Sequence, residues 1–233
     1  MAKFIVIEGT DGCGKQTQTE LLAENLRNAG RNVIIQSFPN YNSASSGPVK
    51  LYLDGKLCER ATDFDAYKAS VLFIVDRLCT ITKLEKELDE NDIVIFDRYV
   101  ESNLIYHAPK IASAHERNKF IKWDLATEYE VLGLPKPTMV FFLNMPPEMS
   151  YQLAHARGEL KTGGAQDIHE KDAEYLTRCW HCGLQLANNQ GWTVVDCAID
   201  GQIRTREDIA DEIYGHVDSY LKACNLIEDE QER

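Results

Sequence analysis

Five short apolar runs, each bounded by polar or turn residues, indicate the strands of a buried parallel sheet. They are rich in β-branched residues and occupy residues 4–7, 33–35, 93–96, 139–143 and 193–195. Between and after these runs, apolar residues recur with helical spacing over residues 15–29, 65–88, 114–132, 147–157, 172–188 and 206–223. Strands that alternate with helices predict a three-layer α/β fold, with helices flanking a five-stranded parallel sheet.

The 233 residues suffice for one large domain. No repeat, Gly/Ser-rich linker or shift in composition divides the chain. We therefore expect one domain over residues 1–227 and a frayed tail over residues 228–233. The glycines of the stretch GELKTGGA at residues 158–165 break the helical pattern, which predicts a short lid loop over about residues 157–170.

The chain carries 25 Lys and Arg against 37 Asp and Glu, a formal net charge of −12. Such acidity opposes diffuse binding to nucleic acid or to an anionic membrane, so neither is an expected partner. An anionic ligand must instead meet a local cluster of cations. The first apolar run is too short for a signal segment, and no run of about 18 apolar residues occurs, so we expect a cytoplasmic protein.

The seven cysteines are odd in number and irregularly spaced, which favours reduced thiols over a disulfide framework. Cys179 and Cys182 form a C-x-x-C motif, which could serve redox chemistry or zinc binding. The motif lies within a predicted helix and has no second pair at zinc-finger spacing. Packing of that helix is therefore the favoured interpretation.

The strongest local signal is a glycine-rich segment that follows the first predicted strand and opens the first helix. It consists of Gly9, Thr10, Asp11, Gly12, Cys13, Gly14, Lys15, Gln16 and Thr17. The glycines allow backbone N–H groups to wrap a phosphate chain, the helix adds its positive end, and the lysine reaches the outer phosphates. The segment therefore predicts a P-loop that binds ATP.

One position departs from the usual P-loop pattern. Gln16 stands where a Ser or Thr hydroxyl usually binds Mg²⁺. Thr17 lies one residue further on, which turns its side chain by about 100° round the helix. Mg²⁺ ligation at this position is therefore left open.

Asp97 and Arg98 follow the third predicted strand directly. Open α/β sheets place ligand-binding groups at the carboxyl ends of their strands. Asp97 could hold or orient a metal ion, and Arg98 could grip a second phosphate with two parallel hydrogen bonds. An ion pair between these neighbours is the alternative.

The chain has no N-K-x-D guanine motif, which counts against a GTPase and favours a small kinase.

Five segments, in the same order, resemble thymidylate kinases. They are residues 9–15, F-P-N-Y at 38–41, L-F-I-V-D-R at 72–77, D-R-Y-V-E-S-N-L-I-Y at 97–106 and A-R-G-E-L at 156–160, and the resemblance runs from residue 3 to about residue 190. It implies an adenylate-kinase-like fold and a homodimer. It also implies Mg²⁺-dependent transfer of the γ-phosphoryl group of ATP to dTMP, giving dTDP and ADP in dTTP biosynthesis. An acceptor phosphate with a second pKa near 6 is already ionised at neutral pH and needs no general base.

The resemblance implies catalytic roles for Lys15, Arg98, Asp11 and Arg157, and metal binding by Asp97 and Asp11. Lys15 would bind the γ-phosphate and Arg98 the dTMP phosphate, while Asp97 and Asp11 would hold Mg²⁺ or orient the acceptor. Members of the family carry a catalytic arginine either in the P-loop or in the lid. Because Gly12 occupies the P-loop position, Arg157 at the start of the lid is the candidate, with a simple helix-capping role as its alternative.

The same resemblance implies an acceptor site for dTMP. Phe73 would stack on thymine, Arg77 and Asn103 would hydrogen-bond the base edge, and Tyr106 would pack against the sugar. The other expected dTMP-binding residues are Phe38, Tyr41, Ser102 and Glu170. Without the resemblance, Phe73 and Tyr106 read as core positions and Arg77 as a surface partner of Asp76. Asn40 stands where relatives often carry a basic residue, so Arg98 must contribute more to phosphate binding.

Two other functions stay open at this point. A deoxynucleoside kinase would act on an uncharged 5′-hydroxyl and would need a carboxylate base there. A P-loop protein could also bind ATP without useful chemistry, an interpretation that Gln16 and Asn40 favour.

Overall fold

The computed structural model describes residues 2–156, 167–169 and 172–231. Five parallel strands form one sheet in the order β2-β3-β1-β4-β5. These strands are β1 (Lys3–Glu8), β2 (Val33–Ser37), β3 (Ile93–Asp97), β4 (Met139–Asn144) and β5 (Thr193–Asp196). Two further strands, β6 (Ala198–Ile199) and β7 (Gln202–Ile203), pair as a small antiparallel hairpin.

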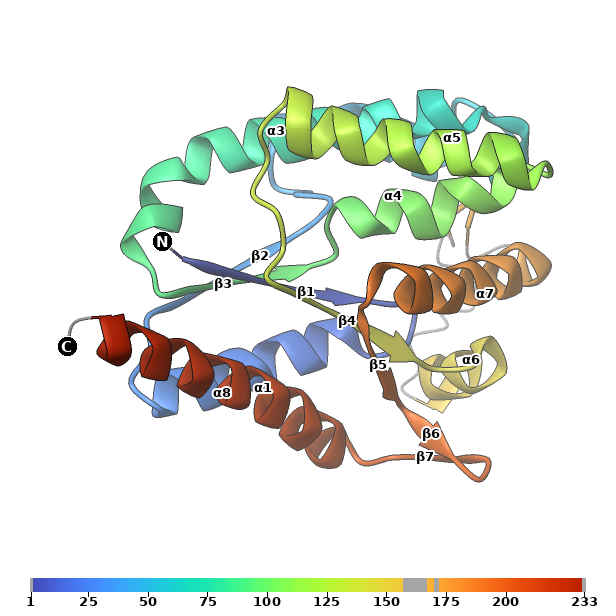
Figure 1. Ribbon diagram of the computed structural model, residues 1–233. Coiled ribbons are helices and arrows are strands. Elements are labelled where there is room, and N and C mark those ends of the chain that lie inside the picture. Colours follow the sequence, from blue (N-terminus) through green and yellow to red (C-terminus); the bar gives the residue numbers. More distant parts are fainter. Residues whose placement is uncertain (1, 157–166, 170–171, 232–233) are drawn as a thin grey trace.

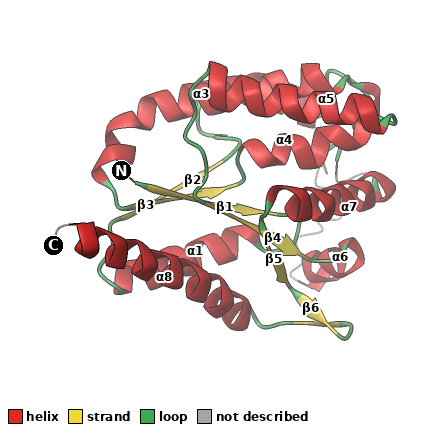
Figure 2. Ribbon diagram, viewed as in Figure 1, coloured by secondary structure: helices red, strands yellow, loops and turns green. Residues whose placement is uncertain are grey.

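Helices cover both faces of the sheet, as Figure 1 shows, and Figure 2 separates them from the strands by colour. Two helices, α1 (Lys15–Asn28) and α8 (Arg206–Gln231), lie against one face; α3 (Ala66–Glu90), α4 (Val100–His107) and α5 (Ala114–Leu125) lie over the other. The remaining helical segments are η1 (Ala44–Ser46), α2 (Gly47–Leu53), η2 (Ala61–Asp63), η3 (Ala108–Lys110), η4 (Ala126–Val131), α6 (Pro147–Ala156) and α7 (Ala173–Gln190). The predicted three-layer α/β fold is confirmed.

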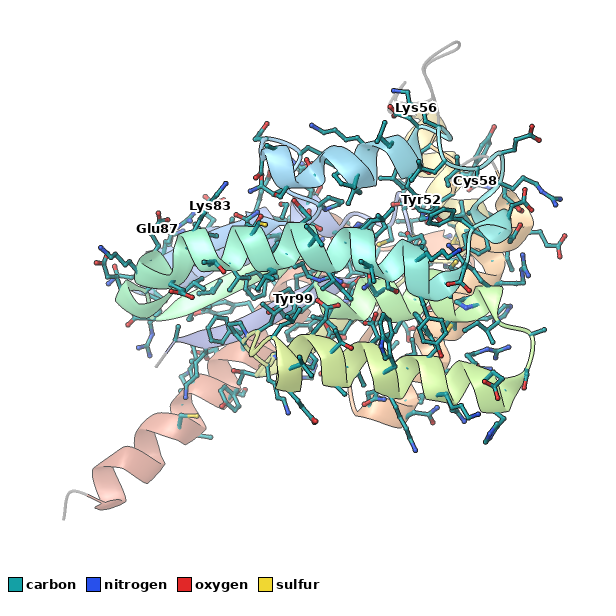
Figure 3. The ribbon with its side chains drawn as sticks, turned by 90° about the horizontal axis from the view of Figure 1, so that it is seen from above. Tyr52, Lys56, Cys58, Lys83, Glu87 and Tyr99 are labelled. Atoms are coloured by element: carbon teal, nitrogen blue, oxygen red, sulfur yellow. The ribbon has the colours of Figure 1, made fainter. Side chains whose placement is uncertain are left out.

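Alternate residues of each central strand pack against opposite helical layers. In β1, Ile5 and Ile7 pack with Leu22 of α1 and Ile213 of α8, whereas Val6 packs with Ile81 of α3. Both faces of the strand are therefore buried, which explains why the strands are apolar at nearly every position. On the α3 side, Tyr99 lies in the interior of the molecule, while Lys83 and Glu87 lie toward the C-terminal end of α3 (Figure 3).

The sequence pattern missed α4 for a physical reason. Every residue of α4 except Ser102 is buried, including Glu101 and Asn103. A helix that buries polar and apolar residues alike has no amphipathic stripe to recognise. The short α2 and the β6–β7 hairpin were also not predicted.

Two helices differ in their ends from the predicted ranges. The helix expected over residues 114–132 runs to Val131, but its last six residues form the π-helix η4. Helix α8 continues to Gln231, into the stretch where we expect a frayed tail, because no Gly or Pro interrupts residues 224–231. In the part of the chain that the structure describes, no helix combines the length and the apolar composition that crossing a membrane requires.

All seven cysteines are free thiols. Cys179 and Cys182 lie on α7 and are buried in the same apolar cluster as Phe142 and Tyr175. Their environment is the one that the packing interpretation predicts. Among the described residues, no group of three or more His, Cys, Asp or Glu side chains is placed to hold a metal ion.

Gly183 tests the contact between α7 and the sheet. A Cβ atom at this position would lie 2.3 Å from Cε2 of Phe142, although alanine is intrinsically the better helix former. We expect Gly183→Ala to lower the free energy of unfolding by about 1–3 kcal/mol in urea denaturation, because the Phe142 ring must move. Gly215→Ala on α8 is the matched control, since nothing lies within 4 Å of its added Cβ. The control should raise the free energy of unfolding by about 0.5–1 kcal/mol. An equal rise for Gly183→Ala and Gly215→Ala would contradict the close contact between Gly183 and Phe142.

Candidate active site

The P-loop connects β1 to α1 at the carboxyl edge of the sheet. Gly9 has φ 149° and Gly14 has φ 94°, a region that side chains with a Cβ rarely adopt. Gly14 forms the left-handed N-cap from which α1 begins, and the first turn of α1 has no acidic residue. The positive end of this helix is therefore available to an anion held by the loop.

Lys15 folds back over this loop. Its side chain is buried, and its Nζ donates to the backbone oxygen of Thr10 at 2.8 Å. The Oγ1 atom of Thr10 is buried without a hydrogen-bond partner among the described residues. Gln16 is exposed, and its side-chain amide donates to Glu20 at 2.9 Å. The loop thus brings a cation and one unpaired hydroxyl group to the beginning of α1.

Asp97 and Arg98 lie beside the P-loop, because β3 pairs with β1. The backbone of Arg98 has φ 65°, which is strained for a residue with a side chain, and its N–H donates to Ile7 O at 3.1 Å. The guanidinium donates to Gly9 O at 3.2 Å and to Asp11 Oδ1. Arg98 therefore joins the end of β3 to the loop that follows β1.

Asp11 accepts hydrogen bonds through both carboxylate oxygens. Arg98 donates to Oδ1, and the Tyr106 hydroxyl donates to Oδ2 at 2.8 Å. Burial alone would raise the pKa of the Asp11 carboxyl, but the charges of Arg98 and Lys15 and the Tyr106 hydrogen bond lower it to about 2. Asp11 is thus a carboxylate at neutral pH, and it neutralises part of the positive charge of the site.

A cavity of about 480 Å³, measured with its open mouth, lies next to this ion pair. The structure places in its wall every predicted dTMP-binding residue that it describes: Phe38, Tyr41, Phe73, Arg77, Arg98, Ser102, Asn103 and Tyr106. Asp11 also lines it. These residues come from the P-loop, the turn after β2, α3, and the segment that runs from the end of β3 through α4, so the fold brings four distant segments to one cavity. Arg157 and Glu170 lie outside the described residues.

Arg77 is not a surface partner of Asp76. Its guanidinium is buried and donates to both carboxylate oxygens of Glu128 at 2.6 Å, and to Tyr99 O at 3.2 Å. Asp76 is buried too, but it accepts instead from the backbone N–H of Asn40 and the hydroxyl of Ser45, both at 2.7 Å. Two adjacent residues of α3 therefore bind different segments of the chain: Arg77 binds η4, and Asp76 binds the segment that follows β2.

Asn103 lies between two buried carboxyl groups. Its Nδ2 donates to Asp124 Oδ1 and to Glu128 Oε1, both at 3.2 Å. Burial, and to a smaller extent repulsion from Glu128, raises the pKa of Asp124 to about 8. Asp124 is therefore protonated at neutral pH, which lowers the number of negative charges around Arg77.

Ser102 binds a carboxylate rather than facing the cavity freely. Its hydroxyl donates to Glu8, with its oxygen 2.9 and 2.8 Å from the two carboxylate oxygens, and the Tyr99 N–H donates to Glu8 at 2.9 Å. Glu8 is the last residue of β1 and is fully buried, which raises its pKa above the usual value. Glu8 thereby fixes the beginning of α4 against the end of β1.

Sequence reasoning missed one wall of the cavity, which contains His169. The His169 ring stacks on Tyr106, with centroids 5.0 Å apart, and its Nε2 lies 3.0 Å from the Tyr52 hydroxyl. Lys110 donates to the same hydroxyl at 2.8 Å. Burial lowers the pKa of His169 to about 3 and that of Lys110 to about 7. The position of His169, next to the predicted Glu170, was the one available signal.

A glycine loop between strand and helix, a lysine folded over it and a carboxylate on the adjacent strand define a P-loop nucleotide-binding protein. Comparison with protein-family models matches residues 7–207 to the family described as thymidylate kinase. The thymidylate kinase of Mycobacterium tuberculosis is 34% identical over 192 residues, which cover 81% of this chain and 87% of that relative. The thymidylate kinase of Thermomicrobium roseum is 26% identical over 95% of this chain and 97% of its own length. The thymidylate kinase of Danio rerio is 24% identical over 90% of this chain and 87% of its own length.

The chain belongs to the thymidylate kinase family. It is an enzyme of this family, a nucleotide kinase that phosphorylates dTMP in dTTP synthesis. The two alternatives that the sequence left open, a deoxynucleoside kinase and an ATP-binding protein without chemistry, are therefore set aside.

The protonated Asp124 predicts a pH dependence of stability. Its folded pKa of about 8 lies above its unfolded value of roughly 3.9, so the folded chain keeps a proton that the unfolded chain loses. The free energy of unfolding should therefore fall as the pH rises from about 4 to about 8. Asp124→Asn cannot ionise and escapes this loss, so its melting temperature should rise relative to that of the wild type between pH 5 and pH 8. Each kcal/mol that the wild type loses in free energy of unfolding corresponds to about 2–4 °C.

Asp211→Asn, at an exposed position of α8, is the control for this experiment. Its melting temperature should follow the wild type at both pH values. A difference between Asp124→Asn and the wild type that stays constant from pH 5 to pH 8 would show that Asp124 is ionised in the folded chain.

Proposed function

We propose that this chain binds ATP at the P-loop and dTMP in the neighbouring cavity, and transfers the γ-phosphoryl group between them to give dTDP and ADP. The observation that carries this proposal is the position of Arg98. Its guanidinium contacts the P-loop through Gly9 O and lines the cavity. Two nucleotides bound on either side of this residue would have their phosphates end to end.

The reaction needs positioning and charge stabilisation more than proton transfer. The dTMP phosphate, with a second pKa near 6, is already ionised. Lys15 would bind the γ-phosphate, and Arg98 would bind the dTMP phosphate in place of part of its contact with Asp11. Arg157 would add a further positive charge to the transferring group, and Glu170 would approach the acceptor sugar.

In the cavity, we assign the base to the end formed by Phe73, Arg77 and Asn103. Phe73 would stack on thymine, and the two polar side chains would hydrogen-bond its edge. Tyr106 would pack against the deoxyribose, where its hydroxyl is held by Asp11. Phe38, Tyr41 and Ser102 would complete the acceptor site.

Asp97 is suited to hold the Mg²⁺ ion that accompanies ATP. Its Oδ1 is buried without a hydrogen-bond partner among the described residues, and hard carboxylate oxygens are the ligands that Mg²⁺ prefers. The metal would neutralise charge on the phosphates as they approach. Asp11, whose two oxygens accept from Arg98 and Tyr106, stays a second predicted ligand.

Measurement of the ADP that the enzyme releases from ATP in the presence of each of a panel of acceptors tests this function. The wild-type enzyme should release ADP with ATP and dTMP, but far more slowly with CMP, AMP or thymidine. Lys15→Ala should lower kcat by about two orders of magnitude or more, because it removes charge that stabilises the transferring group. Lys119→Ala, which removes an exposed lysine paired with Glu116, is the control and should keep the wild-type rate. Equal rates with dTMP, CMP and AMP would contradict the thymine site.

We further propose a cytoplasmic homodimer that associates through α3. This helix exposes Val71 and Val75, one turn apart, with 44% and 42% of their surfaces accessible. Contiguous exposed apolar side chains favour an interface.

Sedimentation of the purified chain tests the homodimer. The wild type should sediment as a dimer and Val71→Glu/Val75→Glu as a folded monomer, because carboxylates resist burial at an interface. Ile199→Glu, on the exposed hairpin, is the control and should stay dimeric. A monomeric wild type would refute this assembly.

A further inference from the structure

We propose that Glu128 is a positioning residue that sets which atoms of Arg77 and Asn103 face the nucleobase, and thereby selects thymine against cytosine. The inference rests on the proposed function, since it concerns the same cavity. Glu128 does not line the cavity, and no sequence motif marks it. It lies behind the two residues that do.

The first part of the argument is the contact with Arg77. The side chains of Arg77 and Glu128 are 2% and 0% exposed, and two parallel hydrogen bonds of 2.6 Å join Nε and Nη2 to the carboxylate. Such a fork fixes the plane of a guanidinium. One N–H of Nη1 is directed to Tyr99 O, so the remaining N–H groups of Nη1 and Nη2 are the donors that Arg77 can offer to the cavity.

The second part concerns the side-chain amide of Asn103. Three acceptors surround one end of this amide: Asp124 Oδ1, Glu128 Oε1 and, at 3.5 Å, Ser70 O. Only the NH₂ group can occupy that end, because Glu128 Oε1 and Ser70 O can accept but not donate a hydrogen bond. The carbonyl oxygen of Asn103 is therefore turned away from the carboxylates, and Asn103 lines the cavity.

Together these contacts give the cavity wall a defined polarity, with a donor from Arg77 beside an acceptor from Asn103. The edge of thymine carries the complementary pair, because O4 accepts and N3–H donates. Cytosine carries the opposite pair, an amino donor and an N3 acceptor. Glu128, which contacts both Arg77 and Asn103, thus opposes cytosine at two positions at once. At each position cytosine would place donor against donor or acceptor against acceptor and leave a buried polar group unpaired.

The local backbone explains how Glu128 reaches this position. Glu128 belongs to the π-helix η4, and its backbone oxygen accepts from Leu134 N at 3.0 Å. Asp124, one turn earlier on α5, is buried on the same side. Short π-helical turns are common at functional sites, where they redirect side chains.

Replacement of Glu128 by glutamine tests the proposal, with kcat and KM measured for dTMP and for dCMP. Glu128→Gln has one acceptor oxygen where Glu128 has two, so in either orientation its NH₂ group would face an N–H of Arg77. The two parallel hydrogen bonds that fix Arg77 are then lost, and Asn103 shares its acceptor with a guanidinium that is no longer held in place. We expect kcat/KM for dTMP to fall at least tenfold, mainly through KM. The ratio of kcat/KM for dTMP to that for dCMP should fall at least tenfold as well, while KM for ATP stays at the wild-type value.

Glu101→Gln is the matched control. Glu101 is a buried glutamate of α4 that accepts from the Tyr129 hydroxyl at 2.7 Å and, in the described structure, contacts neither Arg77 nor Asn103. It should keep the wild-type ratio. The proposal is overturned if folded Glu128→Gln keeps the dTMP to dCMP ratio of the wild type, or if Glu101→Gln lowers that ratio as much.

Removal of one partner of a buried ion pair can prevent folding, so a second variant keeps the test decisive. Glu128→Asp retains the charge that Arg77 requires but withdraws the carboxylate by one methylene group. It should fold and lower the ratio by a smaller factor than Glu128→Gln, and a folded Glu128→Asp with the wild-type ratio would overturn the proposal. A wild-type enzyme without activity on dTMP would instead refute the proposed function, which the panel of acceptors measures first.

Discussion

The contact between Arg98 and the P-loop is the constraint on which the site depends. A chain with a net charge of −12 must bring cations to one place before it can attract phosphates. The parallel pairing of β1 and β3 sets Ile7 beside Asp97, so that Arg98 follows at the edge where the P-loop begins. A strained backbone at Arg98 is tolerated there, because the surrounding strands and the Asp11 carboxylate hold the side chain in position.

Buried acids are the second feature that organises the site. Glu8, Asp124 and Glu128 lie behind the cavity, and each accepts hydrogen bonds from a residue that lines it or follows β3. Burial raises the pKa of Glu8 and Asp124, which limits the negative charge close to an anionic substrate. The acids therefore orient side chains such as Arg77 without repelling a nucleotide. Their position in the interior also explains why α4, which helps to enclose them, has no amphipathic pattern.

Local patterns predicted most of the fold and much of the site. The five strands could be predicted because both faces of the sheet are buried, so the runs are continuously apolar. The P-loop could be predicted because its chemistry depends on neighbouring residues, from Gly9 to Lys15. Phe73, Arg77, Asn103 and Tyr106 were identified by resemblance alone, since spacing by itself indicates core positions for Phe73 and Tyr106 and a surface partner of Asp76 for Arg77.

The sequence by itself determined the five strands of the parallel sheet, most of the long helices, the phosphate-binding loop and the family to which the chain belongs. Only the tertiary structure decided what each polar side chain faces. Arg77 pairs with Glu128, 51 residues away, and His169 stacks on Tyr106 from a segment far along the chain. Propensity and periodicity act over a few residues, whereas a buried ion pair depends on which helices the parallel sheet brings together. The partners of a buried charge are therefore set by topology, and no local pattern records them.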